Sequence, residues 1–214
     1  TVDGEGHLTL VPHEQQTAAA PTSGNPTGPR IRALLGLIAS ADLPWTVRGG
    51  TLRIQDGAVA SETGRLTVSG TLSPAGQADL TLVLSDQDAS AVAGALRVPF
   101  GIEGRAGFAG RLSGPLRAPL VEGRATVRTL SLRGHRAGDL ATSLRYVDRT
   151  LAFRETDWRK DDARYDVSGR LEWTADASPG FDLTARLRTA RVGDVLPIAF
   201  RPLPIDAVVG GPFT

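Results

Sequence analysis

A block of about one hundred residues occurs twice in this chain, and this duplication limits the possible folds more than any other feature. The segment Val68–Leu72 returns as Val167–Leu171, 99 positions later, and Leu52–Asp56 returns as Leu151–Glu155 at the same offset. Two further matches later in the block are offset by 103 positions, so one turn is a few residues longer in the second copy. Matches that keep their order at a fixed period predict a repeat architecture, in which each unit depends on its neighbours to cover its apolar face.

Within each block, apolar residues occupy every second position of short segments. Leu80, Leu82 and Leu84 are one such set, and the positions between apolar residues are mostly Thr, Ser, Asp and Arg. This period places the apolar side chains on one face of an antiparallel sheet and the polar ones in water. Glycine and proline between the segments, as in Ser113–Pro115, supply the turns. We therefore expect an all-β chain of repeated antiparallel strands with only minor short helices.

The first 44 residues predict a strand, a linker and a helix. Residues 1–11 are expected to form the terminal strand of a preceding repeat, and residues 12–29, rich in Ala, Thr, Gly and Pro, a flexible linker. Residues 30–44 predict an amphipathic helix that Pro44 ends, because proline cannot donate to the helix ladder. The helical spacing i, i+3, i+4, i+7 is that of Ile31, Leu34, Leu35 and Ile38.

The rest of the chain divides into the two blocks. We expect block 1 over residues 45–99 and block 2 over residues 100–201, with residues 202–214 as the start of a further repeat. Short helices are predicted to interrupt the strands at residues 88–96 and 190–196, which are equivalent places in the two blocks. The repetition therefore predicts two similar structural units in series.

The composition argues against several classes of protein. The 24 basic and 23 acidic residues give a net charge of +1, which offers no electrostatic basis for binding nucleic acid. Cysteine is absent, so neither a disulfide nor a thiolate metal site can form in this segment. The longest apolar run is far shorter than the roughly 18 residues of a membrane-spanning helix, so we expect any membrane anchor to lie outside this segment.

No group of residues predicts an active site. Glu155, Asp157, Asp161 and Asp162 cluster in sequence and could supply a carboxylate pair, but a charged hairpin tip explains them more simply, since no apolar pocket is evident nearby. The glycines at every third position of residues 101–110 lack the Gly-Lys-Ser/Thr of a phosphate loop and predict turns or close backbone contacts. We therefore expect no enzymatic activity, no metal and no cofactor.

One segment resembles a known family. Residues 107–125, GFAGRLSGPLRAPLVEGRA, are similar to the recurring glycine- and proline-containing element of TamB and its AsmA-like relatives. Leu130–Leu132 and Val167–Leu171 continue the resemblance, which covers most of residues 45–214. The resemblance implies a long sheet curled into an open groove, or β-taco, in a protein that is anchored at the inner membrane of a diderm bacterium and crosses the periplasm.

The resemblance also implies a function and partners. Such proteins are linked to phospholipid transport towards the outer membrane and, with an outer-membrane β-barrel partner, to assembly of barrel proteins. Phospholipid acyl chains would lie in the groove, since each methylene that leaves water contributes about 0.8 kcal/mol. The predicted lining residues are Leu66, Val68, Leu80, Leu82, Leu84, Val167, Leu171, Leu183 and Leu187.

The alternating apolar positions are also compatible with a closed core and with different functions. An ordinary closed core would show the same alternation, although the aromatic content of only 5% slightly favours a groove, because rings usually fill a thick sandwich core. The fold could also serve as a chaperone or scaffold for secretion and assembly of outer-membrane β-barrel proteins such as autotransporters, through addition of a strand to a sheet edge. A purely structural β-repeat protein is the remaining alternative.

Overall fold

The structure, a computed structural model, describes residues 4–10, 38–95, 101–173, 180–189 and 207–209. These residues form one sheet of twelve strands whose spatial order is the order of the chain. One helix, α2, follows β5 in this part of the chain. The elements are β1 (Gly4–Leu10), β2 (Ile38–Arg48), β3 (Thr51–Ser61), β4 (Arg65–Leu72), β5 (Gln77–Asp88), α2 (Ala89–Ala95), β6 (Ile102–Pro115), β7 (Leu120–Leu132), β8 (His135–Val147), β9 (Thr150–Lys160), β10 (Ala163–Glu172), β11 (Gly180–Thr189) and β12 (Ala207–Val209).

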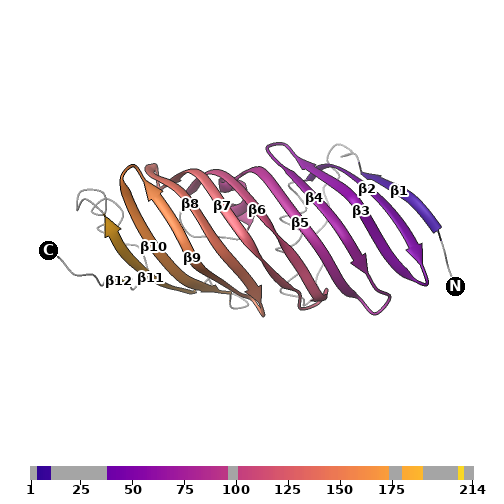
Figure 1. Cartoon of the computed structure of the whole chain (residues 1–214). Coiled ribbons are helices and arrows are strands. Elements are labelled where there is room, and N and C mark those ends of the chain that lie inside the picture. The colour runs from indigo at the N-terminus through magenta and orange to yellow at the C-terminus, as the bar shows by residue number, and fades with distance from the viewer. Residues whose placement is uncertain (1–3, 11–37, 96–100, 174–179, 190–206, 210–214) are drawn as a thin grey trace, which may run out of the picture.

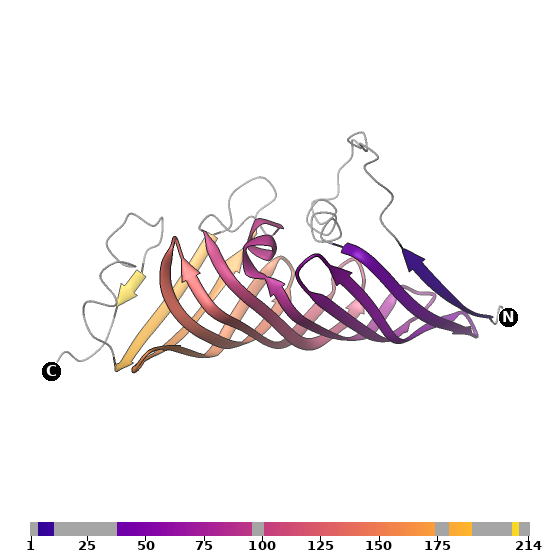
Figure 2. The same cartoon turned by 90° about the horizontal axis from the view of Figure 1, so that it is seen from above.

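The sheet is a single curled layer that does not close. Strands β1 to β11 are antiparallel to their neighbours, as in a continuous meander (Figure 1). Seen from above, the strands bend into an open trough, with β1 and β12 at its opposite ends (Figure 2). The predicted all-β class and the curled, elongated sheet are thereby confirmed. One strand departs from the expected pattern, because β12 pairs parallel to β11.

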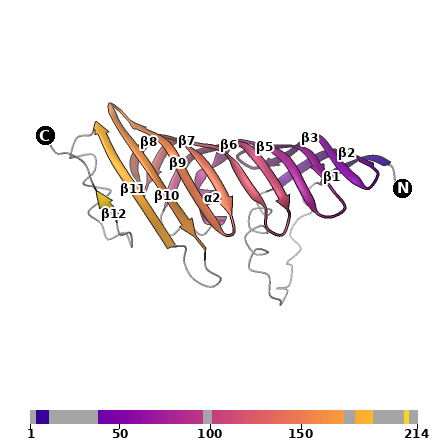
Figure 3. The same ribbon diagram turned by 60° about the horizontal axis from the view of Figure 1, so that its bottom comes forward.

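The two copies of the repeat occupy equivalent hairpins. The β3–β4 hairpin is the first copy and the β9–β10 hairpin is the second, and both are visible in the tilted view of Figure 3. Ile54 faces Gly70 across the first hairpin, and Phe153 faces Gly169 across the second. Each residue of the second pair lies 99 positions after its counterpart. The sequence repeat is therefore a repeat of strand pairing as well.

A β-bulge interrupts every odd-numbered strand from β3 to β9. The pairing register shifts beside each bulge, and one non-glycine residue there adopts a left-handed backbone. A bulge places two residues opposite one, bends its strand and increases the local twist. Bulges on alternate strands therefore account for the curl of the sheet. The left-handed residues are Asp56 (φ 51°), Asp86 (φ 53°), Thr129 (φ 50°) and Glu155 (φ 53°).

The helix predicted over residues 30–44 is wrong where the structure describes it. Residues from Ile38 onward form β2, and residues 30–37 lie outside the described part. Pro44 is tolerated inside the strand because the register with β3 is irregular between Asp42 and Trp45, and prolines in sheets are found at such places. The signal that outweighs the helical spacing is a strand period of two over Ala41, Leu43, Trp45 and Val47.

The remaining predicted segments correspond to the structure as follows. Strand β1 lies within the predicted terminal strand, and α2 confirms the helical interruption expected at residues 88–96. The linker at 12–29 and the second interruption at 190–196 lie outside the described residues. Strand β12 lies within the predicted further repeat at 202–214. Since β5 pairs with β6, the two predicted blocks share one sheet.

Candidate functional site: the concave apolar face

Apolar side chains gather on one face of the sheet, and β5 shows this face most clearly. Leu80, Leu82 and Leu84 are half-buried, whereas Thr81 and Val83 between them are exposed. Val83 is apolar like its neighbours, yet 42% of its surface is exposed because it lies on the opposite face. Side chains converge and screen one another on the concave side of a curved sheet and diverge on the convex side. The half-buried apolar face is therefore the concave face.

One row of residues, which we call the central row, crosses this face from β3 to β11. Its members face one another from strand to strand, none is polar and none is exposed. Since neighbouring strands lie about 4.8 Å apart, the eight intervals of the row span about 38 Å. The central row is Gly57, Val68, Leu82, Gly110, Gly123, Leu144, Phe153, Gly169 and Leu183.

The structure brings the predicted lining residues together on this face. None of the eight whose side chains are described is either fully buried or exposed; they are Leu66, Val68, Leu80, Leu82, Leu84, Val167, Leu171 and Leu183. The side chain of the ninth, Leu187, is outside the described set, while its backbone faces Tyr165 of β10. Half-burial differs from the near-complete burial of a closed core. Among the described residues, no large side chain is completely buried and no second sheet faces this one.

Glycines in the concave face make room for aromatic rings that lie against the sheet. Gly110 and Gly123 face each other across β6 and β7. A β-carbon at either position would lie 2.5 Å or 2.8 Å from Cζ of Phe108, closer than real β-carbons approach other atoms. Trp45 of β2 covers Gly6 of β1 in the same way, at 2.7 Å. The structural role predicted for the glycines of residues 101–110 is therefore confirmed at Gly110, and Gly123 joins it.

The polar groups on the concave face bond to one another. Thr142 and Thr156 are 4% and 2% exposed, and their Oγ1 atoms lie 2.8 Å apart. Since the Thr142 hydroxyl donates to the backbone oxygen of Arg154 at 3.1 Å, Thr156 is the donor within the pair. The buried Gln87 donates from Nε2 to Thr63 and accepts from Ser61. No buried side-chain polar atom in the described residues lacks a partner, so these groups add no free hydrogen-bonding site to the face.

The convex face is charged, with cations and anions paired across strands. Arg111 donates to both carboxylate oxygens of Asp79, at 2.6 Å and 2.5 Å, and these hydrogen bonds lower the pKa of Asp79 below its ordinary value. Arg145 lies 3.3 Å from Glu122, and Arg170 lies 3.3 Å from Asp182. Exposed pairs of this kind contribute little to stability. These charged side chains keep the convex face hydrated. One face of the sheet is therefore charged and the other apolar.

The carboxylates that the sequence singled out lie along β9 and its turn, where ion pairs and hydrogen bonds hold three of them. Arg159 donates to both oxygens of Asp157, which lowers the pKa of that carboxyl group, and the hydroxyl of Ser143 donates to Glu155 at 3.1 Å. Asp161 lies at the β9–β10 turn, 3.8 Å from Arg136. Asp162 lies in the same exposed turn. These residues are therefore part of a charged hairpin, β9–β10.

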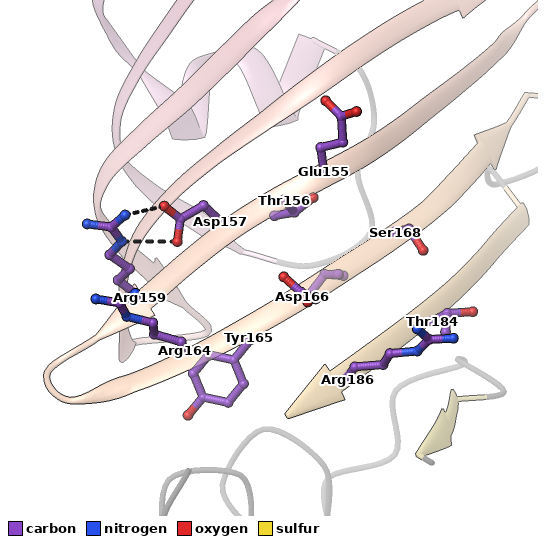
Figure 4. A pocket seen from close by; sticks show the side chains of 11 residues that line it. Glu155, Thr156, Asp157, Arg159, Arg164, Tyr165, Asp166, Ser168, Thr184 and Arg186 are labelled. Carbon is purple, nitrogen blue, oxygen red and sulfur yellow. Dashed lines mark hydrogen bonds and ion pairs between the residues drawn. The ribbon is translucent and has the colours of Figure 1, made fainter. Parts of the chain in front are cut away.

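A pocket of about 680 Å³ lies beside them over β9, β10 and β11 (Figure 4). Three arginines and three carboxylates contribute to its lining, together with the hydroxyls of Ser168 and Thr184. Figure 4 shows the Asp157–Arg159 pair at one side of it and Arg186 at the other. The basic and acidic side chains of this lining are equal in number, so the pocket carries no net charge.

Metal clusters and membrane-spanning helices are both absent from the described residues. No group of three or more His, Asp or Glu side chains there could hold a metal ion. No helix in the same ranges is both long and apolar enough to cross a membrane.

The fold and this face together define a class, an open single-layer β-sheet with one apolar concave face and one charged convex face. Comparisons of the chain with models of protein families, with curated proteins and with solved structures found no match. Since no similar protein suggests a function, the function proposed below is argued from the chemistry of the concave face.

Proposed function

We propose that this protein conducts phospholipids, with their acyl chains lying on the concave apolar face. The observation that carries the proposal is the central row, which stays apolar across nine strands and is faced by no second sheet in the described residues. An acyl chain that moves from water onto such a surface gains about 0.8 kcal/mol for each methylene it buries. Binding and passage of lipid on this face require no catalytic residue and no cofactor.

The dimensions of the face suit this cargo. The hydrocarbon core of a bilayer is about 30 Å thick and accommodates two acyl chains end to end. The central row, at about 38 Å from the strand spacing, is longer than either chain. A phospholipid could therefore lie with its acyl chains along the trough, while its headgroup stays in water at the open side.

The resemblance of residues 107–125 to TamB and AsmA-like proteins supplies the proposed setting. The protein would be held at the inner membrane of a diderm bacterium by an anchor outside this segment and would cross the periplasm. Phospholipid would pass towards the outer membrane, and an outer-membrane β-barrel protein would be the partner there. The opposite character of the two faces supports this setting, because lipid needs an apolar path through an aqueous compartment.

A charge on the concave face tests the proposal, and β5 offers a matched control. Leu82→Asp places a carboxylate in the central row, whereas Val83→Asp places the same group on the exposed convex face one residue later. We expect Leu82→Asp to abolish co-purification of phospholipid and transfer of fluorescent phospholipid between vesicles, and Val83→Asp to preserve both. Equal loss in the two variants, or no loss in either, would contradict the proposal.

A second candidate function, a chaperone for barrel proteins, is favoured by the edge of the sheet. Among the described residues strand β1 pairs with β2 alone, so its other edge has no partner there and offers a place for an added strand. The backbone N–H groups of neighbouring residues point to opposite edges, so either His7→Pro or Leu8→Pro removes a donor from the free edge. On this alternative one of these variants blocks binding of a barrel-derived peptide and leaves lipid binding intact. A result in which neither affects peptide binding would exclude this function for β1.

A further inference from the structure

In one cross-strand pair on the concave face, both residues change from aliphatic to aromatic between the two copies of the repeated hairpin. In the first copy Val59 of β3 faces Leu66 of β4. In the second copy, 99 positions later, Trp158 of β9 faces Tyr165 of β10. Two aliphatic side chains at the same place in the same structural unit are thus replaced by two rings.

The rings form a fixed pair. Their centroids lie 5.0 Å apart, with an interplanar angle of 42°. The indole Nε1 of Trp158 donates a hydrogen bond to the backbone oxygen of Ala137 on β8, which sets the orientation of the larger ring. Aromatic pairs at such distances are stabilised beyond their area of burial. The pair is therefore held in a defined orientation by contacts within β8–β10.

The tyrosine of this pair is more deeply buried than its counterpart in the first copy. Tyr165 is 9% exposed, whereas its counterpart Leu66 is half-buried. Trp158 and its counterpart Val59 are both half-buried, and Thr156 and its counterpart Gly57 are both buried. The two rings are larger than the two aliphatic side chains, so they fill more of the concave face over β9 and β10 than Val59 and Leu66 fill over β3 and β4.

A second aromatic contact lies at the other end of the same strands. Tyr146 of β8 and Trp173, which follows β10, meet edge to face with centroids 6.2 Å apart. Trp173 is buried, whereas Pro74, its counterpart 99 positions earlier, is exposed. The β8–β10 section therefore has rings towards both of its margins, whereas the β3–β5 section has no aromatic residue.

We propose that the Trp158–Tyr165 pair is a size filter for the lipid cargo, which limits how much hydrocarbon the β8–β10 section of the concave face accepts. This inference rests on the proposed function, since it concerns passage of acyl chains. The β3–β5 section holds acyl chains freely, and the aromatic pair restricts their entry into the next section. Trp158 and Tyr165 are thus specificity-determining residues for the size of the cargo.

Val68 and Val167 provide matched probe positions. They are 99 positions apart, both are half-buried on the concave face, and each lies on the second strand of its hairpin. Two variants of the full chain are made, one with a photoreactive side chain at each position. Each variant is mixed with vesicles of a two-chain phospholipid and irradiated. We expect a yield of phospholipid adduct several-fold lower at Val167 than at Val68.

Two exchanges between the copies complete the test. The double variant Trp158→Val/Tyr165→Leu gives the second copy the residues of the first, and the adduct at Val167 should rise to the yield at Val68. The reciprocal variant Val59→Trp/Leu66→Tyr should lower the adduct at Val68. Equal yields at the two positions of the unexchanged protein would overturn the size filter and leave the proposed function standing. No adduct at either position would overturn the proposed function itself.

Discussion

The ring of Phe153 lies over Gly169 on the concave face. The two residues face each other across β9 and β10, and Cζ of the ring is 2.9 Å from the place where a β-carbon of residue 169 would stand. Their counterparts Ile54 and Gly70 face each other in the first copy of the hairpin. The repeat therefore preserves a pairing of a large residue with a glycine, and in the second copy this pairing lets the Phe153 ring lie against the sheet.

Gly169→Ala should destabilise the sheet. The added β-carbon would meet the backbone oxygen of Asp182 at 2.3 Å as well as the Phe153 ring. A backbone atom cannot move away without a shift of β11, so we expect a loss of about 1–3 kcal/mol in the free energy of unfolding, as for other overpacked sites. Denaturant unfolding followed by circular dichroism measures it. Gly101→Ala is the control, because nothing lies within 4 Å of its β-carbon position, and equal losses would contradict the close contact.

The bulge at Asp56 predicts that valine at this position destabilises the protein more than glycine does. Asp56 has a φ of 51°, a left-handed conformation that aspartate tolerates and β-branched residues avoid. Asp56→Val should lower the free energy of unfolding by about 1–2 kcal/mol, whereas Asp56→Gly should have little effect. Thermal unfolding of the two variants and of the unsubstituted protein measures the difference in stability. A valine variant as stable as the glycine variant would show that residue 56 is not left-handed in solution.

The Asp79–Arg111 pair predicts a dependence on pH. The hydrogen bonds from Arg111 lower the pKa of Asp79 in the folded protein. A carboxyl group with a lowered folded-state pKa contributes stability above its unfolded pKa of about 3.9 and loses that contribution as the pH falls through the folded value.

We therefore expect the carboxyl carbon of Asp79 to titrate below its usual range in an NMR experiment, and Arg111→Gln to move the transition upward. Because both side chains are exposed, the accompanying change in stability should be small. A titration curve of Asp79 that is the same in both proteins would refute the pairing.

The threonine pair on the concave face predicts non-additive substitutions. Thr156→Val removes the donor to Thr142, while the Thr142 hydroxyl still donates to Arg154. Loss of a buried hydrogen bond of this kind costs about 1 kcal/mol in the free energy of unfolding. Thr142→Val should cost at least as much, since it removes two hydrogen bonds. The double variant Thr142→Val/Thr156→Val should be less destabilised than the sum of the single variants, and strict additivity would argue against the pair.

The architecture was predictable from the sequence to a large extent. The duplication, the period of two and the glycine- and proline-containing turns give an all-β meander, and the short helix after β5 was expected at residues 88–96. Eight predicted lining positions share a face because a period of two places residues on one side of any strand. The resemblance to TamB-like proteins supplied the curl, which alternation alone does not specify.

Three features could not be predicted from the pattern. The helical spacing that ends at Ile38 competes with a strand period that starts at Ala41, and pairing with β1 and β3 decides in favour of the strand. The bulges at Asp56 and Glu155 depend on register between strands, which a single segment does not reveal. The close contact of Phe108 with Gly123 joins two strands and is visible only in three dimensions.

Photo-crosslinking from two adjacent positions of β5 in the full-length protein is the sharpest test of a lipid path on the concave face. A reactive side chain at Leu82 lies in the central row, and one at Thr81 lies on the exposed convex face. We predict a phospholipid adduct at Leu82 and none at Thr81. No adduct at Leu82, or equal adducts at both positions, would contradict an apolar path for lipid on the concave face.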